Sequence, residues 1–193
     1  MDDLFGRYLS CIYGAPATGK TNICLLLAAK ASKSGKVFFI DTENTFSPER
    51  IKDFNGKLCN ILVLKPKNFR DQCTSTDNLL KLKDKVKLVI VDSLSMHYRP
   101  LIQQKADINP RLSRQLSILS EIAKDSCPVI ITCQVYANLE GQIMPVGGNM
   151  VKNWSSAVIN VRQERDRKMI VEKHPNGKRN IAFEINSRGI DFF

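Results

Sequence analysis

Long apolar runs are missing from this sequence of 193 residues, and none approaches the roughly 20 residues of a membrane-spanning helix. The N-terminus carries Asp2 and Asp3, where a secretory signal would carry positive charge. Internal repeats, low-complexity tracts and linkers are also absent. We therefore expect a soluble, cytoplasmic protein with no membrane association, folded as one domain over residues 1–193.

Cysteine pairs of the C-x-x-C type are absent as well, although the chain holds six cysteines. Most of these cysteines fall in apolar stretches, so we expect small core residues in a reducing compartment rather than disulfides. The two histidines, His97 and His174, have no Cys or carboxylate partners at ligand spacing. The sequence thus gives no indication of a His or Cys metal site.

Acidic residues are too few to balance the basic ones, with 19 Asp and Glu against 29 Lys and Arg, and the net charge is +10. Such an excess favours a polyanionic partner. The basic residues are spread along the chain, and Glu164 and Asp166 dilute the cluster formed by Arg162, Arg165, Arg167 and Lys168.

One motif stands out from this background, the pattern G-x-x-x-x-G-K-[ST] between an apolar strand, 9–13, and an apolar helix, 22–31. This arrangement is typical of a phosphate-binding loop, whose glycines let backbone N–H groups approach phosphate oxygens. Lys20 would follow the β- and γ-phosphates, and Thr21 would hold Mg²⁺. We expect the nucleotide to contact Gly14, Ala15, Pro16, Ala17, Thr18, Gly19, Lys20, Thr21 and Asn22.

Strand-like and helical stretches alternate along most of the chain, which predicts an α/β fold with a mostly parallel central sheet flanked by helices. The predicted strands are 8–13, 36–41, 60–64, 87–92 and 128–134, and the predicted helices are 20–33, 48–55, 68–83 and 110–125. Three later runs, 156–163, 168–174 and 181–186, predict antiparallel strands added at one edge of the sheet. The stretches 95–109 and 136–153 are expected to be irregular.

Polar side chains follow three of the apolar strands, where ligands bind in α/β proteins. Asp92 is expected to support Mg²⁺, Glu43 to act as the catalytic base, and Gln134 to sense the γ-phosphate. Each residue taken alone could equally be a polar side chain that faces a turn. The phosphate-loop motif is what favours the functional reading of all three.

These segments together resemble the RecA-type recombinases of archaea and eukaryotes. The resemblance rests on 40–50 (IDTENTFSPER), 89–94 (VIVDSL), 112–116 (LSRQL) and 134–135 (QV). Further segments, 46–50, 96–99, 172–174 and 183–191, narrow it to a group of short archaeal paralogues of the strand-exchange recombinase. The resemblance covers almost the whole chain.

The resemblance implies a RecA-type P-loop NTPase core that uses ATP and Mg²⁺, with Lys20, Glu43 and Gln134 catalytic. It also implies that the phosphate-loop strand is central, followed by the Gln134 strand, the Asp92 strand and the Glu43 strand. DNA would be contacted by the two irregular loops, in which Arg99, Lys105 and Tyr136 are the candidate contacts. Few cations lie there, so we expect weak, sequence-independent DNA binding.

Three departures from the family pattern bear on assembly. No N-terminal DNA-binding domain is expected, and no F-x-x-A polymerisation motif occurs. Lys173 stands where the recombinases carry an Asp that reaches the neighbouring ATP. Its ammonium could replace a cation beside the γ-phosphate, as an interface residue, or could simply lie on the surface of an edge strand.

We therefore expect an accessory or mediator protein that acts with a strand-exchange recombinase paralogue, binds ATP and hydrolyses it slowly. A monomer or small homo-oligomer is expected. One alternative is an autonomous, DNA-dependent strand-exchange recombinase. Another is a KaiC-like RecA-fold signalling ATPase with no role on DNA.

Overall fold

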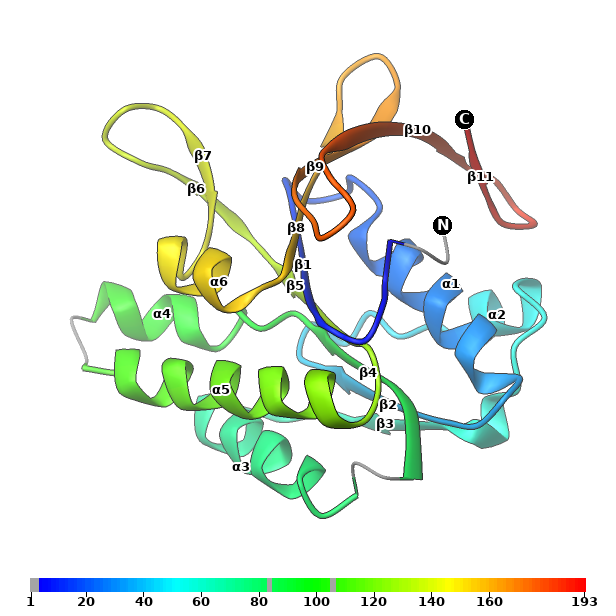
Figure 1. Ribbon diagram of the computed structural model, residues 1–193, viewed down its shortest axis with the longest axis horizontal. Helices are drawn as coiled ribbons and strands as arrows, with labels where there is room; N and C mark the ends of the chain where they lie inside the picture. The colour runs from blue at the N-terminus through cyan, green and yellow to red at the C-terminus, as the bar shows by residue number, and fades with distance from the viewer. Residues whose placement is uncertain (1–3, 83–84, 105–106) are drawn as a thin grey trace.

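The computed structural model describes residues 4–82, 85–104 and 107–193, in which helices pack on both faces of one sheet (Figure 1). The helices are α1 (Lys20–Ser32), α2 (Pro48–Asp53), α3 (Phe69–Leu79), α4 (Tyr98–Gln103), α5 (Asn109–Asp125) and α6 (Gly148–Trp154), with a 3-10 turn, η1 (Leu58–Asn60). The strands are β1 (Leu9–Tyr13), β2 (Lys36–Asp41), β3 (Ile61–Leu64), β4 (Val86–Asp92), β5 (Val129–Cys133), β6 (Val135–Ala137), β7 (Ile143–Pro145), β8 (Ala157–Gln163), β9 (Arg167–Lys173), β10 (Arg179–Ile185) and β11 (Ile190–Phe192).

The main sheet has the order β11-β10-β9-β8-β1-β5-β4-β2-β3. The strands from β8 to β3 run parallel, and β9, β10 and β11 are antiparallel to their neighbours. The order β1, β5, β4, β2 confirms the arrangement that the family resemblance implied. One detail differs from our expectation, because β8 itself pairs parallel with β1.

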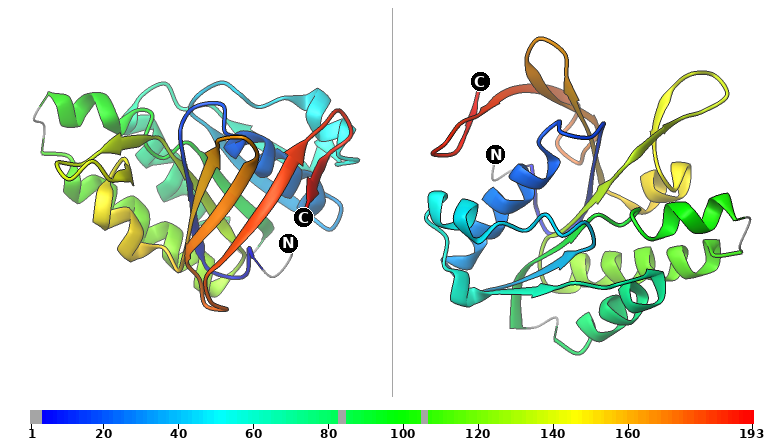
Figure 2. Two further views of the ribbon diagram at one scale, coloured as in Figure 1. Left: turned by 90° about the horizontal axis from the view of Figure 1, so that it is seen from above. Right: turned by 180° about the vertical axis from the view of Figure 1, so that it is seen from behind.

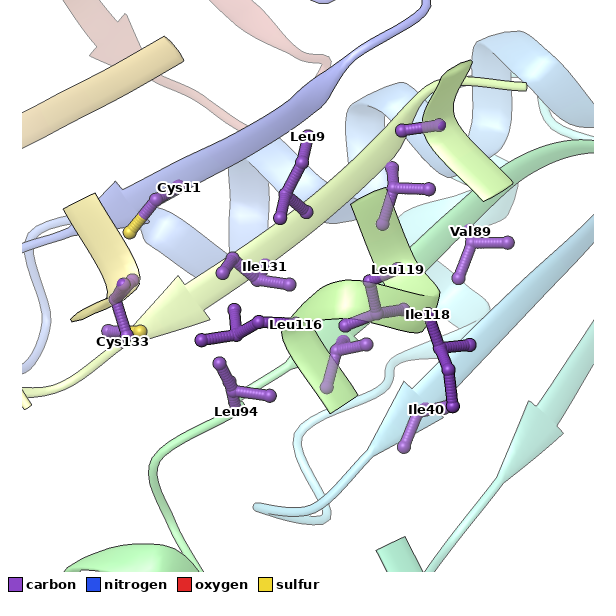
Figure 3. Packing of buried hydrophobic residues seen from close by; sticks show 14 of the residues in the cluster. Leu9, Cys11, Ile40, Val89, Leu94, Leu116, Ile118, Leu119, Ile131 and Cys133 are labelled. Carbon is purple, nitrogen blue, oxygen red and sulfur yellow. The ribbon is translucent and has the colours of Figure 1, made fainter. Parts of the chain in front are cut away.

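Two buried clusters, one on each face, hold the parallel strands in place. On one face β1 and β5 pack against α5, and Figure 3 shows Leu9 and Ile131 facing Leu116 and Leu119. On the other face the buried side of α1 packs against β2, β4 and β5 (Figure 2). β1 and β5 are buried at every position, which explains why their sequences read as continuous apolar runs.

Local sequence signals explain where several helices begin. Ser47 accepts a hydrogen bond from the N–H of Arg50 at 3.1 Å, and Pro48 opens α2. Asn68 caps α3 in the same way, accepting from the N–H of Asp71 at 2.9 Å. The prediction extended α3 to residue 83, but the helix ends at Leu79.

The two stretches that were expected to be irregular contain regular structure, so that expectation was wrong. Residues 95–109 hold α4, and residues 136–153 hold α6 and most of the β6–β7 hairpin. The six-residue helix and three-residue strands are too short to show a periodicity. Asn138 stabilises the tip of the hairpin by accepting from the N–H groups of Glu140 and Gln142, at 3.1 and 2.8 Å.

The antiparallel strands at the C-terminal edge curve over α1, and β11 lies beside that helix (Figure 1). β11 was not predicted. Gly177, with φ of 91°, lies in the turn between β9 and β10. Among the described helices, none has the length and apolar character needed to cross a membrane.

Candidate functional site

The loop between β1 and α1 is shaped by two glycines. A Cβ added to Gly14 would lie 2.2 Å from the carbonyl oxygen of Val161, so the backbone leaves no room for a side chain. Gly19 has φ of 108°, a conformation that favours glycine. The loop therefore keeps its backbone close to the neighbouring strand and turns sharply into α1.

The first turn of α1 has the properties of an anion site. Gly19 caps the helix without a side-chain hydrogen bond, and no acidic residue lies in the first turn. The N–H groups there are left to interact with a ligand, and the helix dipole favours negative charge. This geometry fits the phosphate groups of a nucleotide along residues 14–22.

Lys20 lies folded over this loop. Its Nζ donates to the carbonyl oxygens of Gly14 and Ala15, at 2.9 and 2.8 Å. Burial lowers the pKa of Lys20, and the carboxylates of Asp92 and Glu43 oppose that shift. The ammonium is thus beside the loop and near two acidic side chains.

Asp92 ends β4 and is only 2% exposed. Its carboxylate accepts hydrogen bonds from the hydroxyl of Thr21, at 2.8 Å, and from the hydroxyl of Thr132. Burial raises the pKa of Asp92, and these two hydrogen bonds offset part of the increase. A carboxylate beside a hydroxyl is the kind of oxygen pair that Mg²⁺ prefers, so Thr21 and Asp92 fit a magnesium site.

Glu43 lies just after β2, at the same edge of the sheet as Asp92. Its Oε1 accepts hydrogen bonds from Ser93 Oγ at 2.7 Å and from Gln134 Nε2 at 3.1 Å. Asp41 shapes the turn that carries Glu43, because it accepts from the N–H groups of Thr45 and Phe46. The structure thus brings the candidate base and the candidate γ-phosphate sensor into direct contact.

Ser93 is a site residue to which the sequence analysis gave no role. Thr42 Oγ1 donates to the Ser93 carbonyl oxygen at 2.8 Å, and the Ser93 N–H donates back to Thr42 Oγ1 at 2.8 Å. The N–H of Thr42 also donates to the Asp92 carbonyl oxygen at 2.9 Å. The available sequence signal was a serine directly after an acidic strand end.

Gln134 connects this site to α4. Its side-chain oxygen accepts a hydrogen bond from Arg99 at 3.3 Å, and its backbone N–H donates to Ser95 Oγ at 2.8 Å. Arg99 is exposed on α4. A continuous chain of hydrogen bonds therefore runs from Glu43 through Gln134 to Arg99, one of the candidate DNA contacts.

Arg50 is another residue to which the sequence analysis gave no individual role, although it ends the segment 40–50 that carries the family resemblance. Its guanidinium donates to Asn22 Oδ1 at 3.3 Å and to the carbonyl oxygens of Asn186 and Ser187. It also lies 4.5 Å from the centre of the Phe54 ring. Arg50 thereby links the start of α1 to the turn between β10 and β11.

Two of the three candidate DNA contacts lie around a cavity of about 490 Å³ between α4, β6 and α6. Arg99 and Tyr136 both line this cavity, together with Ile102 and Met150. The third candidate, Lys105, falls outside the described residues. Large apolar side chains are exposed in this region, with Leu139 fully exposed and Ile143 48% exposed.

Lys173 lies at the end of β9, and its Nζ donates to the carbonyl oxygen of Lys152 at 3.2 Å. It is exposed, but β9 pairs with both β8 and β10, so the idea of an edge strand was wrong. The adjacent Glu172 accepts from Tyr13 Oη at 2.6 Å and from Lys152 Nζ at 2.9 Å.

In the described part of the chain, no three His, Cys, Asp or Glu side chains gather into a metal-binding cluster. Magnesium held between a carboxylate and nucleotide phosphates needs no such cluster. The described cysteines are free, and Cys59 differs from our expectation because it is exposed.

Comparisons with known proteins agree with this geometry. A family model described as Rad51 matches residues 5–192. A DNA repair and recombination protein RadB from Methanococcus maripaludis is 35% identical over 199 residues, covering 96% of this chain and 91% of the relative. RadB from Methanosphaera stadtmanae is 33% identical over 213 residues, covering 98% and 92%. RadB from Methanocaldococcus jannaschii is 34% identical over 193 residues, covering 93% and 91%. These matches confirm the resemblance to short archaeal recombinase paralogues.

Proposed function

The chain belongs to the Rad51 family, and we propose that it binds ATP with Mg²⁺, hydrolyses it slowly and assists a strand-exchange recombinase in DNA repair. One observation carries the proposal. The ends of β2, β4 and β5 bring Glu43, Asp92 and Gln134 together with Lys20 and Thr21 of the phosphate loop. Ligands of α/β proteins bind at this end of the strands.

Each of these side chains has a distinct role in the proposed site. Lys20 holds the β- and γ-phosphates, while Thr21 and Asp92 hold Mg²⁺, which supplies charge neutralisation on the phosphates. Glu43 accepts a proton from the attacking water. Gln134 contacts the γ-phosphate. Its hydrogen bond with Arg99 connects the nucleotide site to α4.

The DNA role is supported by the names of the relatives, which are called DNA repair and recombination proteins. The candidate contacts in this chain are Arg99, Lys105 and Tyr136. Phosphate contacts need Lys or Arg, and Arg99 is the only one of the described candidates that carries positive charge. We therefore propose weak DNA binding with little sequence preference, in the cytoplasm.

We propose that the protein assists a recombinase rather than carrying out strand exchange by itself. The 193 residues contain no F-x-x-A motif, and Lys173 would present a positive charge where the family carries an acidic residue. A monomer or small oligomer should persist with ATP and DNA, and the proposed partner is a recombinase paralogue. Electron microscopy checks this, since long regular filaments of this protein alone would favour an autonomous recombinase.

The decisive experiment measures ATP turnover alone, with single-stranded DNA, and with the cognate recombinase added. The mediator proposal expects slow turnover alone and an increase in joint-molecule formation by the recombinase. Fast DNA-dependent turnover with joint molecules formed by this protein alone would favour the autonomous recombinase. Failure to bind DNA even at low salt would favour the signalling ATPase.

A further inference from the structure

A small polar cluster lies buried between α3 and α5, within the apolar cluster on that face of the sheet. Gln72 and Thr76 are fully buried, and Gln115 is 2% exposed. Buried amides and hydroxyls are costly unless they are hydrogen-bonded. Apolar side chains of similar size would pack at these positions without that cost, so the contacts made by the amides need an explanation.

The amide of Gln72 reaches out of the helix pair toward the candidate site. Its Nε2 donates to the carbonyl oxygen of Leu94 at 3.0 Å and to Gln115 Oε1 at 3.2 Å. Both partners are acceptors, and Leu94 O can never donate, so the amide must present its NH₂ group to them. Gln115 in turn donates to Cys73 Sγ at 3.2 Å. The single hydroxyl hydrogen of Thr76 has the backbone carbonyl oxygen of Gln72 as its nearer acceptor, at 3.0 Å, and Gln115 Oε1 as the more distant one, at 3.4 Å.

The orientation of Gln72 comes at the expense of its own oxygen. Gln72 Oε1 is buried and has no hydrogen-bond partner in the described part of the chain. The side chain thus leaves one polar atom unsatisfied while it holds the Leu94 carbonyl. An apolar side chain of similar size would leave no such atom unsatisfied, so packing stability alone would not favour a glutamine here.

Leu94 belongs to the short segment that follows Asp92. Ser93 donates to Glu43, Ser95 accepts from the N–H of Gln134, and the Leu94 N–H donates to the Thr132 carbonyl oxygen at 2.9 Å. These contacts tie the segment to the loop after β2 and to the C-terminal end of β5, within the candidate site. The bond from Gln72 ties the same segment to α3, on the opposite side.

We propose that Gln72, oriented by Gln115, is a positioning residue for the ATP site. It fixes the Leu94 carbonyl and so sets where Ser93 presents its hydroxyl to Glu43. Loss of this bond lets the segment shift and misplaces Glu43, while the phosphate loop stays intact. The expected change in turnover rests on the proposed ATP hydrolysis. The expected change in hydrogen exchange does not, because it is measured in nucleotide-free protein.

The test compares Gln72→Met with Thr76→Val. Met has a similar volume and cannot bond Leu94, whereas the valine removes a buried hydroxyl of the same cluster and leaves the Gln72 to Leu94 bond in place. Two quantities are measured: steady-state ATP hydrolysis, and amide hydrogen exchange of Leu94 and Gln134 in nucleotide-free protein.

For Gln72→Met we expect kcat to fall by about tenfold or more with KM for ATP within about twofold, because misplacement of a catalytic group affects the chemical step. Exchange at Leu94 and Gln134 should accelerate. Thr76→Val should leave kcat and both exchange rates unchanged. If Gln72→Met does not fold, Gln115→Met frees the Gln72 amide to rotate and should change the same quantities in the same direction.

The two measurements separate the possible failures. A wild-type protein that neither binds nor hydrolyses ATP would refute the proposed function, and the exchange rates would still decide whether Gln72 holds the segment. Where wild-type turnover is measurable, unchanged kcat or unchanged exchange in the glutamine variants would overturn the positioning role. Equal effects of Thr76→Val on both quantities would also overturn it, by assigning them to general loss of packing.

Discussion

The candidate ATP site at the ends of β2, β4 and β5, here called the nucleotide edge of the sheet, differs from the region formed by α4 with the β6–β7 hairpin. The difference lies in how many of their polar side chains are hydrogen-bonded within the protein. At the nucleotide edge the side chains of Thr21, Asp92, Glu43 and Gln134 are bonded to one another or to the strands beside them. In the other region large apolar side chains are exposed, and Arg99 is the described cation that lines its cavity.

This difference indicates which region is ready for its ligand before the ligand arrives. Strand ends in a buried parallel sheet hold their side chains within narrow limits, as the proposed hydrolysis requires. The α4 and hairpin region offers few fixed phosphate contacts, which fits the weak DNA binding that we propose. The hydrogen bond between Arg99 and Gln134 is where the two regions meet.

The largest effect expected at the nucleotide edge is from Lys20→Ala. This change removes the ammonium beside the phosphate loop, so ATP binding should be lost. Isothermal calorimetry with Mg²⁺ and ATP measures the affinity. Lys33→Ala, at the exposed C-terminal end of the same helix, is the control and should bind ATP as the wild type does. Equal affinities in Lys20→Ala and wild type would refute the phosphate-loop assignment.

Glu43→Gln should separate binding from turnover. The amide oxygen can still accept hydrogen bonds from Ser93 and Gln134, so the site should stay intact. An amide cannot take the proton of the water, and turnover should fall by about 10²-fold or more while ATP affinity persists. Single-turnover hydrolysis measures this, with Glu140→Gln on the hairpin as the control. Unchanged turnover in Glu43→Gln would place the base elsewhere.

A smaller effect is expected in the other region, from Arg99→Gln. Loss of one phosphate contact should weaken DNA binding several-fold and lower the slope of log K against log salt by about one, for every sequence tested. Fluorescence anisotropy at several salt concentrations provides the measurement. Lys57→Gln, exposed beside η1, controls for the loss of one net charge. Sequence-dependent losses, or an unchanged slope, would contradict a phosphate contact.

The same contrast separates what the sequence could predict from what it could not. The phosphate loop and the strands that lead to Asp92 and Glu43 were predictable, because a motif and buried apolar runs encode them locally. The contact of Arg99 with Gln134 was not, because a six-residue helix leaves no periodicity and the contact spans 35 positions. The parallel pairing of β8 with β1 was also missed, because strand composition does not specify direction and the helix that connects to β8, α6, is too short to show a periodicity.

The smallest effect concerns Glu172, which lies between the two regions. It lines a cavity of about 640 Å³ that Ala15 of the phosphate loop and Ile143 of the hairpin also line. Burial by itself raises the pKa of Glu172, but hydrogen bonds from Tyr13 and Lys152 outweigh it and lower the pKa overall. The ionised carboxylate therefore stabilises the fold.

The pH dependence follows from this direction. A carboxyl group whose pKa is lower in the folded state contributes its stabilisation above its unfolded pKa, about 4.3, and loses it as pH falls through the folded value. Glu172→Gln should therefore lower the free energy of unfolding at pH 7 by about 1 kcal/mol or less, since the group is only half-buried. The difference from wild type should shrink below about pH 4.3. Urea denaturation between acidic and neutral pH measures it, with the exposed Glu184→Gln as the control. A difference that is constant with pH would mean that the charge of Glu172 does not stabilise its contacts with Tyr13 of β1 and Lys152 of α6.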